Sequence, residues 1–448
     1  MLLYLLMPAL GTAGDALLES QATVHTLDNG MTVILEPQTR TDTIALNFEF
    51  GVGARDEGEG EFGCAHLFEH LMFEGSANVP TNAFDTWLKA AGGDNNAWTS
   101  EDRTVYTMSF PSGALDLALF LESDRLGFLD AGLNEENVAN QQLVVLQERN
   151  QGYAEPGGRT WDALSRVHFP ADHPYHHPVI GTVADIEGFQ IDKVRSFWDR
   201  HYRTRNAVLT LVGNFEPEHA LERIEHWFSD VPDRGDAMER GQPPLPAGQS
   251  EAQAGVLGED VEDRTLFLVW DGPHAGHPDQ AALDVAAWVL SGGRGTRLSE
   301  AMLERRPIAE DADSLAYSSD LSGQFGIYAS SYKTPLAKLE KVMLAELAGL
   351  VEEPPSAAEL ERAKSQMRAS LHRSMERPEA RAESLSDCLR MTGDANCMPG
   401  EWAKVEAVDA SAVVAAVQTW LSGPPTRLYV VPSAEITTLE GVTPVELP

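Results

Sequence analysis

One order of elements occurs twice in this sequence, half a chain apart, and it limits the fold more than any other feature. Residues 190–213 read as an amphipathic helix, a short polar break and a strand from Ala207 to Gly213. Residues 409–431 have the same order, with a strand from Arg427 to Val431. A repeat with a period near half of the 448 residues indicates two homologous domains. Each domain would hold roughly 200 residues, which is an ordinary size.

The boundary between the two copies falls in a segment rich in proline, glycine and polar residues, Asp233 to Gly255. That composition is typical of a linker, although a long surface loop inside one domain has it too. The repeat favours the linker. We therefore predict an N-terminal segment over 1–20, a first domain over 21–232, a linker over 233–255 and a second domain over 256–448.

Strand and helix patterns are mixed within both predicted domains. Runs of β-branched and apolar residues predict strands, and a 3.6-residue period predicts helices. The mixture predicts an α+β fold, with a mixed or antiparallel sheet covered by helices in each domain. Strands are expected at 31–37, 43–52, 103–111, 207–213, 264–272, 323–332 and 427–431. Helices are expected at 63–76, at 81–93 with Thr81 as N-cap and Gly92 near the C-cap, and at 112–127, 134–151, 279–293 and 294–306.

The charge balance excludes two classes of partner. The chain has 33 basic and 69 acidic residues, a formal net charge of −36. Such a surface repels nucleic acid and anionic lipid. The negative charge can attract basic peptides, but net charge mainly affects solubility. We therefore interpret the acidity as a solubility adaptation.

The N-terminus resembles a secretory signal. An apolar run from Leu2 to Leu10 precedes the small residues Gly11, Thr12 and Ala13, with a cleavage point expected after Ala13. The usual positive charges before the apolar run are missing, so a mis-assigned start or a frayed apolar terminus is the alternative. We predict export, to the periplasm. No later stretch is long and apolar enough to span a membrane.

The three cysteines suggest one disulfide. Cys388 and Cys397 are close enough in sequence for a short-loop disulfide, which an exported protein can keep. Cys64 lies two residues before His66, and residues two apart on a helix point to different faces. We interpret Cys64 as a packing residue.

The most specific motif of the sequence is H-x-x-E-H, formed by His66, Glu69 and His70. On a helix the two histidines project from one face, one turn apart, and imidazoles at that spacing can bind zinc. Glu69 lies beside them, where a carboxylate can accept a proton from a water at the metal. The alternative is an ordinary amphipathic helix with the histidines and the glutamate on its solvent-exposed face. Spacing alone leaves both interpretations open.

A catalytic zinc needs a third protein ligand from another element. Glu148 stands near the end of an apolar helical run, Leu143 to Leu146, and is one candidate. The other acidic and histidine candidates are Glu101, Asp102, Glu135, Glu136, Glu155, His173, His176 and His177. Spacing alone does not decide among them.

Residues 63–76 resemble the metal helix of the inverzincins, the pitrilysin/insulysin family of metallopeptidases. Other segments resemble further parts of that family, so the resemblance extends over nearly the whole chain, from about 24 to 432. These segments are "LDNGMTVILEP", "GGDNNAWTSEDRTVYTMSFP", "HPYHHPVIGT" and "LSGGRGTRL".

The resemblance implies one Zn²⁺ per chain and two homologous α+β domains. It implies Glu148 as third ligand, because "VVLQE" matches the V-V-x-x-E helix of the family. A second Glu, two turns earlier in that helix, supports the metal in the family; here Gln141 takes its place. The family strand that binds extended peptide by main-chain hydrogen bonds corresponds to Asn96 and Ala97. For Asn96 alone, a turn after Gly92-Gly93 is the alternative.

One departure from the family pattern suggests a partner. Self-sufficient members share an Arg…Tyr pair, in an R-x-x-x-G-L-A-Y-like stretch, that steadies the substrate carbonyl. A gapless alignment puts Leu303 and Glu310 at those positions. Tyr317 lies in another "LAY", but aligning it requires an insertion. The resemblance therefore implies the zinc-bearing subunit of a hetero- or homodimer, whose homologous partner supplies the Arg/Tyr pair.

We therefore predict a zinc metalloendopeptidase that cleaves extended peptides or proteins. Two alternatives belong to other classes: a non-catalytic scaffold subunit, and an acidic peptide-binding protein whose zinc is structural. Glu69 distinguishes them, because a structural zinc has no need of a base beside it.

Overall fold

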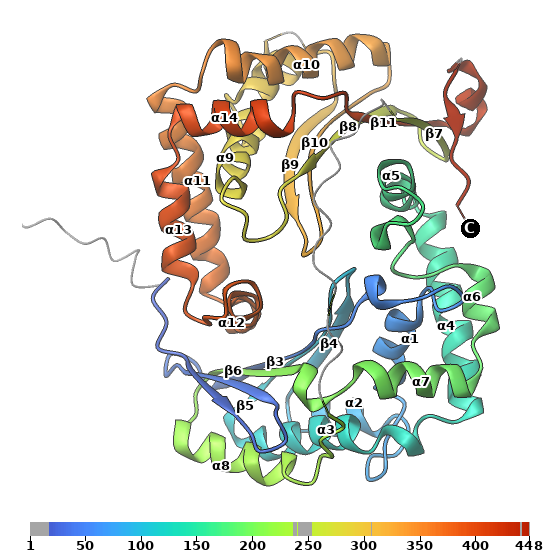
Figure 1. Cartoon of the computed structure of the whole chain (residues 1–448), viewed down its shortest axis with the longest axis vertical. Helices are drawn as coiled ribbons and strands as arrows, with labels where there is room; N and C mark the ends of the chain where they lie inside the picture. The colour runs from blue at the N-terminus through green and yellow to red at the C-terminus, as the bar shows by residue number, and fades with distance from the viewer. Residues whose placement is uncertain (1–17, 236–239, 241–252, 306, 440, 448) are drawn as a thin grey trace, which may run out of the picture.

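Two six-stranded sheets, one in each half of the chain, organise the molecule (Figure 1). The computed structural model describes residues 18–235, 240, 253–305, 307–439 and 441–447. The strand orders are β1-β2-β6-β3-β5-β4 and β12-β7-β11-β8-β10-β9, so the two sheets have equivalent topologies. Parallel pairs, β2 with β6 and β7 with β11, occur beside antiparallel ones. The predicted α+β class with two similar domains is confirmed.

The first half supplies one sheet and eight α-helices among its described residues. Its strands are β1 (Thr23–Thr26), β2 (Thr32–Pro37), β3 (Thr43–Phe50), β4 (Asp94–Thr99), β5 (Thr104–Pro111) and β6 (Ala207–Gly213). Its helices are α1 (Cys64–Leu71), α2 (Ala83–Ala90), α3 (Leu115–Gly127), α4 (Glu135–Ala154), α5 (Thr160–His168), α6 (Val183–Gly188), α7 (Ile191–His201) and α8 (Pro217–Phe228).

The second half supplies the other sheet and six α-helices, again among its described residues. Its strands are β7 (Ala254–Glu259), β8 (Arg264–Gly272), β9 (Asp311–Ser318), β10 (Gly323–Ser331), β11 (Thr426–Pro432) and β12 (Thr443–Pro444). Its helices are α9 (Gln280–Ser291), α10 (Leu336–Glu352), α11 (Ala357–Met375), α12 (Pro378–Thr392), α13 (Met398–Ala407) and α14 (Ala410–Trp420).

The central strand β3 shows how each sheet is covered. Seven consecutive residues after Thr43 are buried, so the side chains of β3 do not alternate between a buried and a solvent-exposed face of the sheet. Such a run is expected where helices cover both faces of a sheet. One face of this sheet packs against helices of its own half, in a core that includes Leu46, Phe48 and Phe68. The other face is covered by a helix from the second half.

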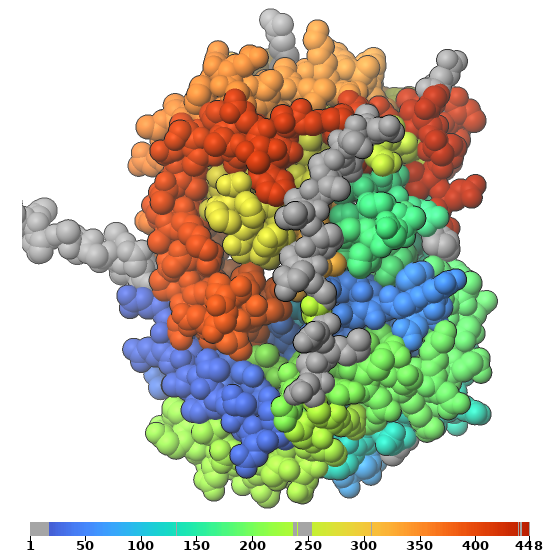
Figure 2. All heavy atoms as spheres, in the orientation of Figure 1, coloured from blue at the N-terminus to red at the C-terminus, as the bar shows by residue number. Residues whose placement is uncertain are grey.

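That covering helix is α12, and the arrangement is reciprocal. Ala382 and Leu385 of α12 pack on Ile34 and Val212 of the first sheet. In the opposite direction, α5 of the first half packs on the second sheet, where Leu164 joins the cluster of Leu257, Phe267 and Leu428. Figure 1 shows α12 over β3 and β6, and α5 beside β7 and β11. In Figure 2 the orange-red atoms of the C-terminal helices lie directly against the blue N-terminal strands.

Buried polar contacts fix the position of α12. The Arg381 guanidinium donates to the Glu36 carboxylate on β2, with Nε to Oε1 at 2.8 Å, and both side chains are at most 7% exposed. The Ser386 hydroxyl accepts from Asn47 Nδ2 at 2.9 Å and lies 2.8 Å from the Thr210 hydroxyl. Three buried polar side chains of the sheet, Glu36, Asn47 and Thr210, thus have a hydrogen-bond partner on a helix of the other half.

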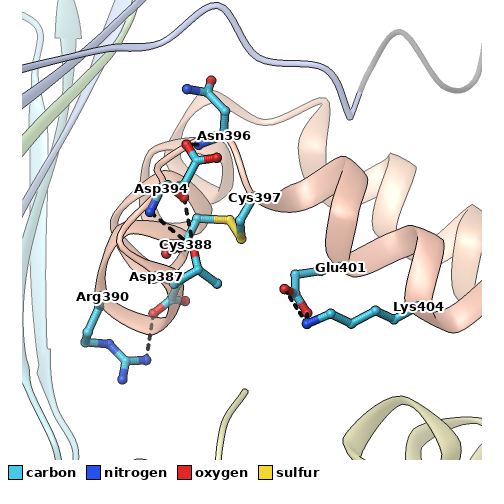
Figure 3. The surroundings of a disulfide bond; sticks show 9 residues. Asp387, Cys388, Arg390, Asp394, Asn396, Cys397, Glu401 and Lys404 are labelled. Carbon is cyan, nitrogen blue, oxygen red and sulfur yellow. Dashed lines mark hydrogen bonds and ion pairs between the residues drawn. A yellow bond between two sulfur atoms is a disulfide. The ribbon is translucent and has the colours of Figure 1, made fainter. Parts of the chain in front are cut away.

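A disulfide joins Cys388, near the end of α12, to Cys397, immediately before α13 (Figure 3). The bond spans nine residues, as the proximity of the two cysteines in the sequence suggested. It ties α12 to α13 at the turn between them. Cys64 is a free, buried thiol in the first core, which agrees with a packing role.

Two local predictions were wrong. The N-cap of α2 is Asn82, in the left-handed conformation with φ +65°, and not Thr81. Asparagine tolerates that conformation because its short polar side chain can bond locally, whereas β-branched threonine does not. The helix expected at 294–306 is reduced to a short π-helical segment, Ser299–Glu304.

Outside the described residues lie 1–17, which include the predicted signal sequence, and residues 236–239 and 241–252 of the predicted linker. In the part of the chain that the structure describes, no helix has the length and apolar character needed to cross a membrane.

Candidate metal centre

The metal motif lies on α1, a helix of two turns that follows β3 and packs on the first sheet. Its apolar face places Leu67, Phe68 and Leu71 in the core, each with no exposed surface. His66, Glu69 and His70 project from the remaining face. His66 is 9% exposed, and the other two lie between buried and exposed. Burial of these apolar positions, at helical spacing, therefore turns both histidines toward the same space.

Glu148 on α4 meets these histidines. Its Oε2 atom lies 3.2 Å from His70 Nε2 and 3.8 Å from His66 Nε2, and its side chain is 50% exposed. One ligand atom from each residue lies within 4.8 Å of the others. Within the described ranges, this is the only group of three histidine, cysteine or acidic side chains that converge in this way.

The other candidates from the sequence are not part of this group. Asp102 is engaged elsewhere, accepting from Arg55 Nη1 at 3.1 Å and from the Tyr175 hydroxyl at 2.6 Å. His173 caps the short helix that begins at Pro174, accepting from the amide of Tyr175. Also outside the cluster are Glu101, Glu135, Glu136, Glu155, His176 and His177.

The donor set fits zinc. Two imidazole nitrogens and one carboxylate oxygen are a known protein ligand set of catalytic zinc, which keeps a fourth position for water or substrate. The Nε2 atoms of both histidines face Glu148, as a shared ion requires. His66 Nδ1 is buried without a hydrogen-bond partner in the described structure, so no hydrogen bond at that nitrogen helps to orient the ring.

Proton affinities differ sharply within the cluster. Burial lowers the pKa of His66 to about 4, which favours the neutral ring that a metal needs. Burial also opposes the charged form of His70, but the hydrogen bond and charge of Glu148 outweigh it and raise the His70 pKa. The hydrogen bond from His70 lowers the pKa of Glu148. A divalent cation would therefore compete with the His70 proton for Glu148.

Glu69 has a partner that the sequence did not reveal. The Thr99 hydroxyl, at the end of β4, donates to Glu69 Oε2 at 2.7 Å. Burial raises the pKa of Glu69 despite this bond. A raised pKa makes a carboxylate a better proton acceptor near neutral pH. Thr99 belongs to the segment "GGDNNAWTSEDRTVYTMSFP", which resembles the family, but only the packing of α1 against β4 connects it to Glu69.

Gln141 lies on α4, two turns before Glu148, and is buried. Its Nε2 donates to Glu74 Oε1 at 2.5 Å, and its side chain also bonds to His70, which contributes to the raised His70 pKa. Glu74 follows α1 and was not singled out in the sequence. It places a carboxylate beside Gln141, so negative charge is present near the position where the family pattern has a second Glu.

Asn96 and Ala97 lie in β4, at the edge of the first sheet and beside α1. Asn96 is exposed and belongs to the strand, so the alternative of a turn is wrong. Ala97 packs against the core below it. The outer edge of β4 has no neighbouring strand among the described residues, so its main-chain groups are available for pairing.

The second half has no such cluster among its described residues. Leu303 packs against the second core, and Glu310 is exposed just before β9, where its carboxylate accepts from the amide of Tyr332. Tyr317 lies on β9, the edge strand of that sheet, with 52% of its surface exposed. Fold and cluster together define a class of protein: two similar α+β halves and, among the described residues, one candidate metal centre, in the first half.

Comparisons with known proteins identify the family. Residues 32–181 match "Insulinase (Peptidase family M16)" and residues 188–367 match "Peptidase M16 inactive domain", which together cover most of the chain. The chain belongs to the M16 family of peptidases. The border between the two matches lies inside the first structural half, since β6 completes the first sheet.

Relatives in the family are described as zinc proteases. An "Uncharacterized zinc protease" of Rickettsia bellii is 27% identical over 81% of this chain and 86% of its own length. The "Zinc protease PqqE" of Helicobacter pylori is 28% identical over 64% of this chain and 65% of its own. The solved structure of a protease from Helicobacter pylori has a TM-score of 0.83 and 25% identity, covering 92% of this chain and all of that one.

Proposed function

We propose that this chain is a zinc-dependent metalloendopeptidase. The observation that carries the proposal is the convergence of His66, His70 and Glu148, with Glu69 beside them. These residues would hold one Zn²⁺ per chain. When bound, the ion supplies a Lewis acid that acidifies a water molecule and polarises a carbonyl.

Glu69 is the proton carrier of the proposed reaction. It is adjacent to His70 on α1, and its carboxylate is oriented by the Thr99 hydroxyl. It accepts the proton of the attacking water and passes it to the leaving amine. Its raised pKa favours both transfers, since an ordinary carboxylate is too weak a base near neutral pH.

The substrate binds along β4. An extended peptide adds to this free edge by main-chain hydrogen bonds through Asn96 and Ala97, and its scissile bond comes to lie beside Glu69. The contact between the end of β4 and Glu69 supports this placement, because it joins the peptide-binding strand directly to the catalytic carboxylate.

We further propose that the chain works with a second, homologous subunit. Leu303 and Glu310 stand at the Arg and Tyr positions of self-sufficient relatives, and neither an aliphatic side chain nor a carboxylate donates a hydrogen bond to a carbonyl oxygen. The partner supplies that pair. The apolar N-terminal run adds the proposal that the protein is exported to the periplasm.

The test combines metal analysis with peptide cleavage. The wild type is expected to contain one zinc per chain and to cleave an unstructured protein, fully only when a homologous Arg/Tyr subunit is added. Glu69→Gln is expected to keep zinc and lose at least 10³-fold in kcat, on the order of the losses seen when a general base is removed.

Three outcomes would contradict parts of the proposal. Retained cleavage by Glu69→Gln removes Glu69 from the mechanism. Full activity of the isolated chain removes the need for a partner. Tight zinc binding without cleavage under any condition leaves the structural-zinc or scaffold function instead.

A further inference from the structure

The N-terminus of the metal helix has no cap of its own. Gly63 occupies the N-cap position of α1 in the left-handed conformation, with φ +96°, and it has no side chain to accept an amide hydrogen bond. α1 has only eight residues, and both histidine ligands and Glu69 lie within them. A helix this short is not stable by itself, because its nucleation cost is spread over few hydrogen bonds.

Glu57 supplies the missing cap from outside the helix. Its Oε2 accepts from the amide of Gly63 at 2.8 Å, and its Oε1 accepts from the amide of Ala65 at 2.7 Å. The Glu57 side chain has no exposed surface, so water cannot replace these bonds. Ala65 is the residue directly before His66, so the second bond holds the backbone next to the first metal ligand.

The segment "HPVIGT" packs against the same point. His177 stacks on Phe62 with ring centroids 4.1 Å apart, and its Nδ1 lies 3.8 Å from Glu57 Oε2. Gly63 and Gly181 both have positive φ, and a Cβ on either one would run into the backbone of the other's segment. This close backbone contact explains why both positions are glycine.

We propose that Glu57 is a positioning residue of the metal centre: its carboxylate fixes the first turn of α1 and so the direction in which His66 and His70 face Glu148. This inference rests on the proposed zinc function. It gives the 177–182 segment a role as well, since that segment packs against Glu57 and the start of α1. Glu57 does not touch the metal, and it acts through the backbone of Ala65.

Glu57→Gln is the sharpest variant. Glutamine keeps the shape but has one acceptor oxygen, so its amide group would face a backbone N–H in a buried space. We expect zinc affinity to fall roughly ten- to a hundred-fold, as for other residues that orient metal ligands. Affinity is measured on the metal-stripped full chain by competition with a chromophoric chelator. Amide exchange, followed by mass spectrometry in the same chain, should become faster in residues 63–71.

Glu359→Gln is the matched control. Glu359 also caps a helix with its carboxylate, accepting from the amide of Ser356 at 2.8 Å at the start of α11. Its replacement is expected to change exchange in α11 and to leave zinc affinity within twofold. If Glu57→Gln fails to fold, Glu57→Asp provides the test of the positioning role. The shorter carboxylate can reach only one of the two amides, so zinc binding should weaken at least threefold.

The outcomes separate this inference from the proposed function. If wild type and His66→Ala bind zinc equally, the metal site itself is wrong. If wild type binds zinc through His66 and Glu57→Gln binds it within twofold, only the positioning role of Glu57 is wrong. Weaker zinc binding together with faster exchange confined to α1 is the result that supports it.

Discussion

At the scale of single residues, the candidate active centre depends on pairs that join different elements. Thr99 on β4 holds Glu69 on α1, and Gln141 on α4 joins Glu74 to His70. Each of these bonds restricts a side chain whose direction matters for proton transfer or metal binding. Orientation of the reacting groups is therefore distributed over three elements.

Thr99→Val tests the orientation of Glu69. The substitution keeps the shape and removes one hydrogen bond to a carboxylate, which is worth about 1.5 kcal/mol or a factor of about ten in rate. We expect kcat to fall about tenfold at unchanged zinc content. Steady-state kinetics and metal analysis measure both. Thr43→Val, on the first residue of β3, is the control and should keep full activity; an unchanged kcat in Thr99→Val would show that Glu69 needs no such support.

The histidine pair could be predicted from the sequence because a spacing of four residues determines a common helix face. Glu148 could not be predicted from spacing alone, since 78 residues separate it from His70 and only the family resemblance selected it. Thr99 and Glu74 were missed for a physical reason. Their contacts with Glu69 and Gln141 depend on how β4 and the end of α1 pack, and no local pattern encodes that packing.

At the scale of elements, α9 holds in the second half the place that α1 holds in the first. Each helix follows the fourth strand in the order of its sheet, β8 or β3. When the buried positions of the two helices are aligned, Asp284 takes the place of His66, and Trp288 that of His70. This replacement explains in residue terms why the described residues of the second half form no metal cluster.

Asp284 lies at a cavity of about 570 Å³ between α9, α11, α12 and α13. Apolar side chains form much of its wall, including Trp288, Met367, Met375 and Trp402. Burial raises the pKa of Asp284 to about 7. The folded protein therefore holds this proton up to about pH 7, whereas the unfolded chain releases it near pH 3.8.

Asp284→Asn should stabilise the protein more at pH 8 than at pH 5. In the wild type, stability falls as the pH rises through this interval, because only the folded state still binds the proton. With a discount for partial exposure, the gain of the variant should grow by about 1–2 kcal/mol. Chemical denaturation at both pH values measures it, with the exposed Asp172→Asn as control. An equal gain at both pH values would mean that Asp284 is ionised throughout.

The elements themselves were predictable to different degrees. The strand Ala207–Gly213 was predicted with its observed bounds, because its apolar run is bounded by polar turns. β9 was missed, since "DADSLAYS" has neither an apolar run nor strict alternation. It becomes a strand because β10 pairs with it along eight residues. Tertiary pairing overrode local preference there.

At the scale of the whole molecule, the Glu36–Arg381 ion pair joins the two halves. Both groups are almost fully buried, so neither is solvated if its partner is removed. Such pairs add little net stability, but breaking one leaves a charge without compensation. The pair therefore selects one position of α12 on the first sheet.

Arg381→Met should destabilise the protein by about 3–5 kcal/mol, because it leaves the Glu36 carboxylate buried alone. The double variant Glu36→Gln with Arg381→Met should recover at least half of that loss. Urea denaturation of both variants measures the two effects. If the double variant is as unstable as Arg381→Met, the loss comes from packing of the arginine stem and not from the charge.

The exchange of α5 and α12 between the halves was not predictable, because sequence patterns do not show which sheet a helix will cover. It has a consequence for the order of events during synthesis. The buried Asn47 side chain has its hydrogen-bond partner in Ser386, which is synthesised 339 residues later. The second face of the first sheet can be covered only after that helix has been made. The packing of the first half is therefore completed only after the second half has been synthesised. The two halves look like separate domains, but their final packing forms in one late step of folding.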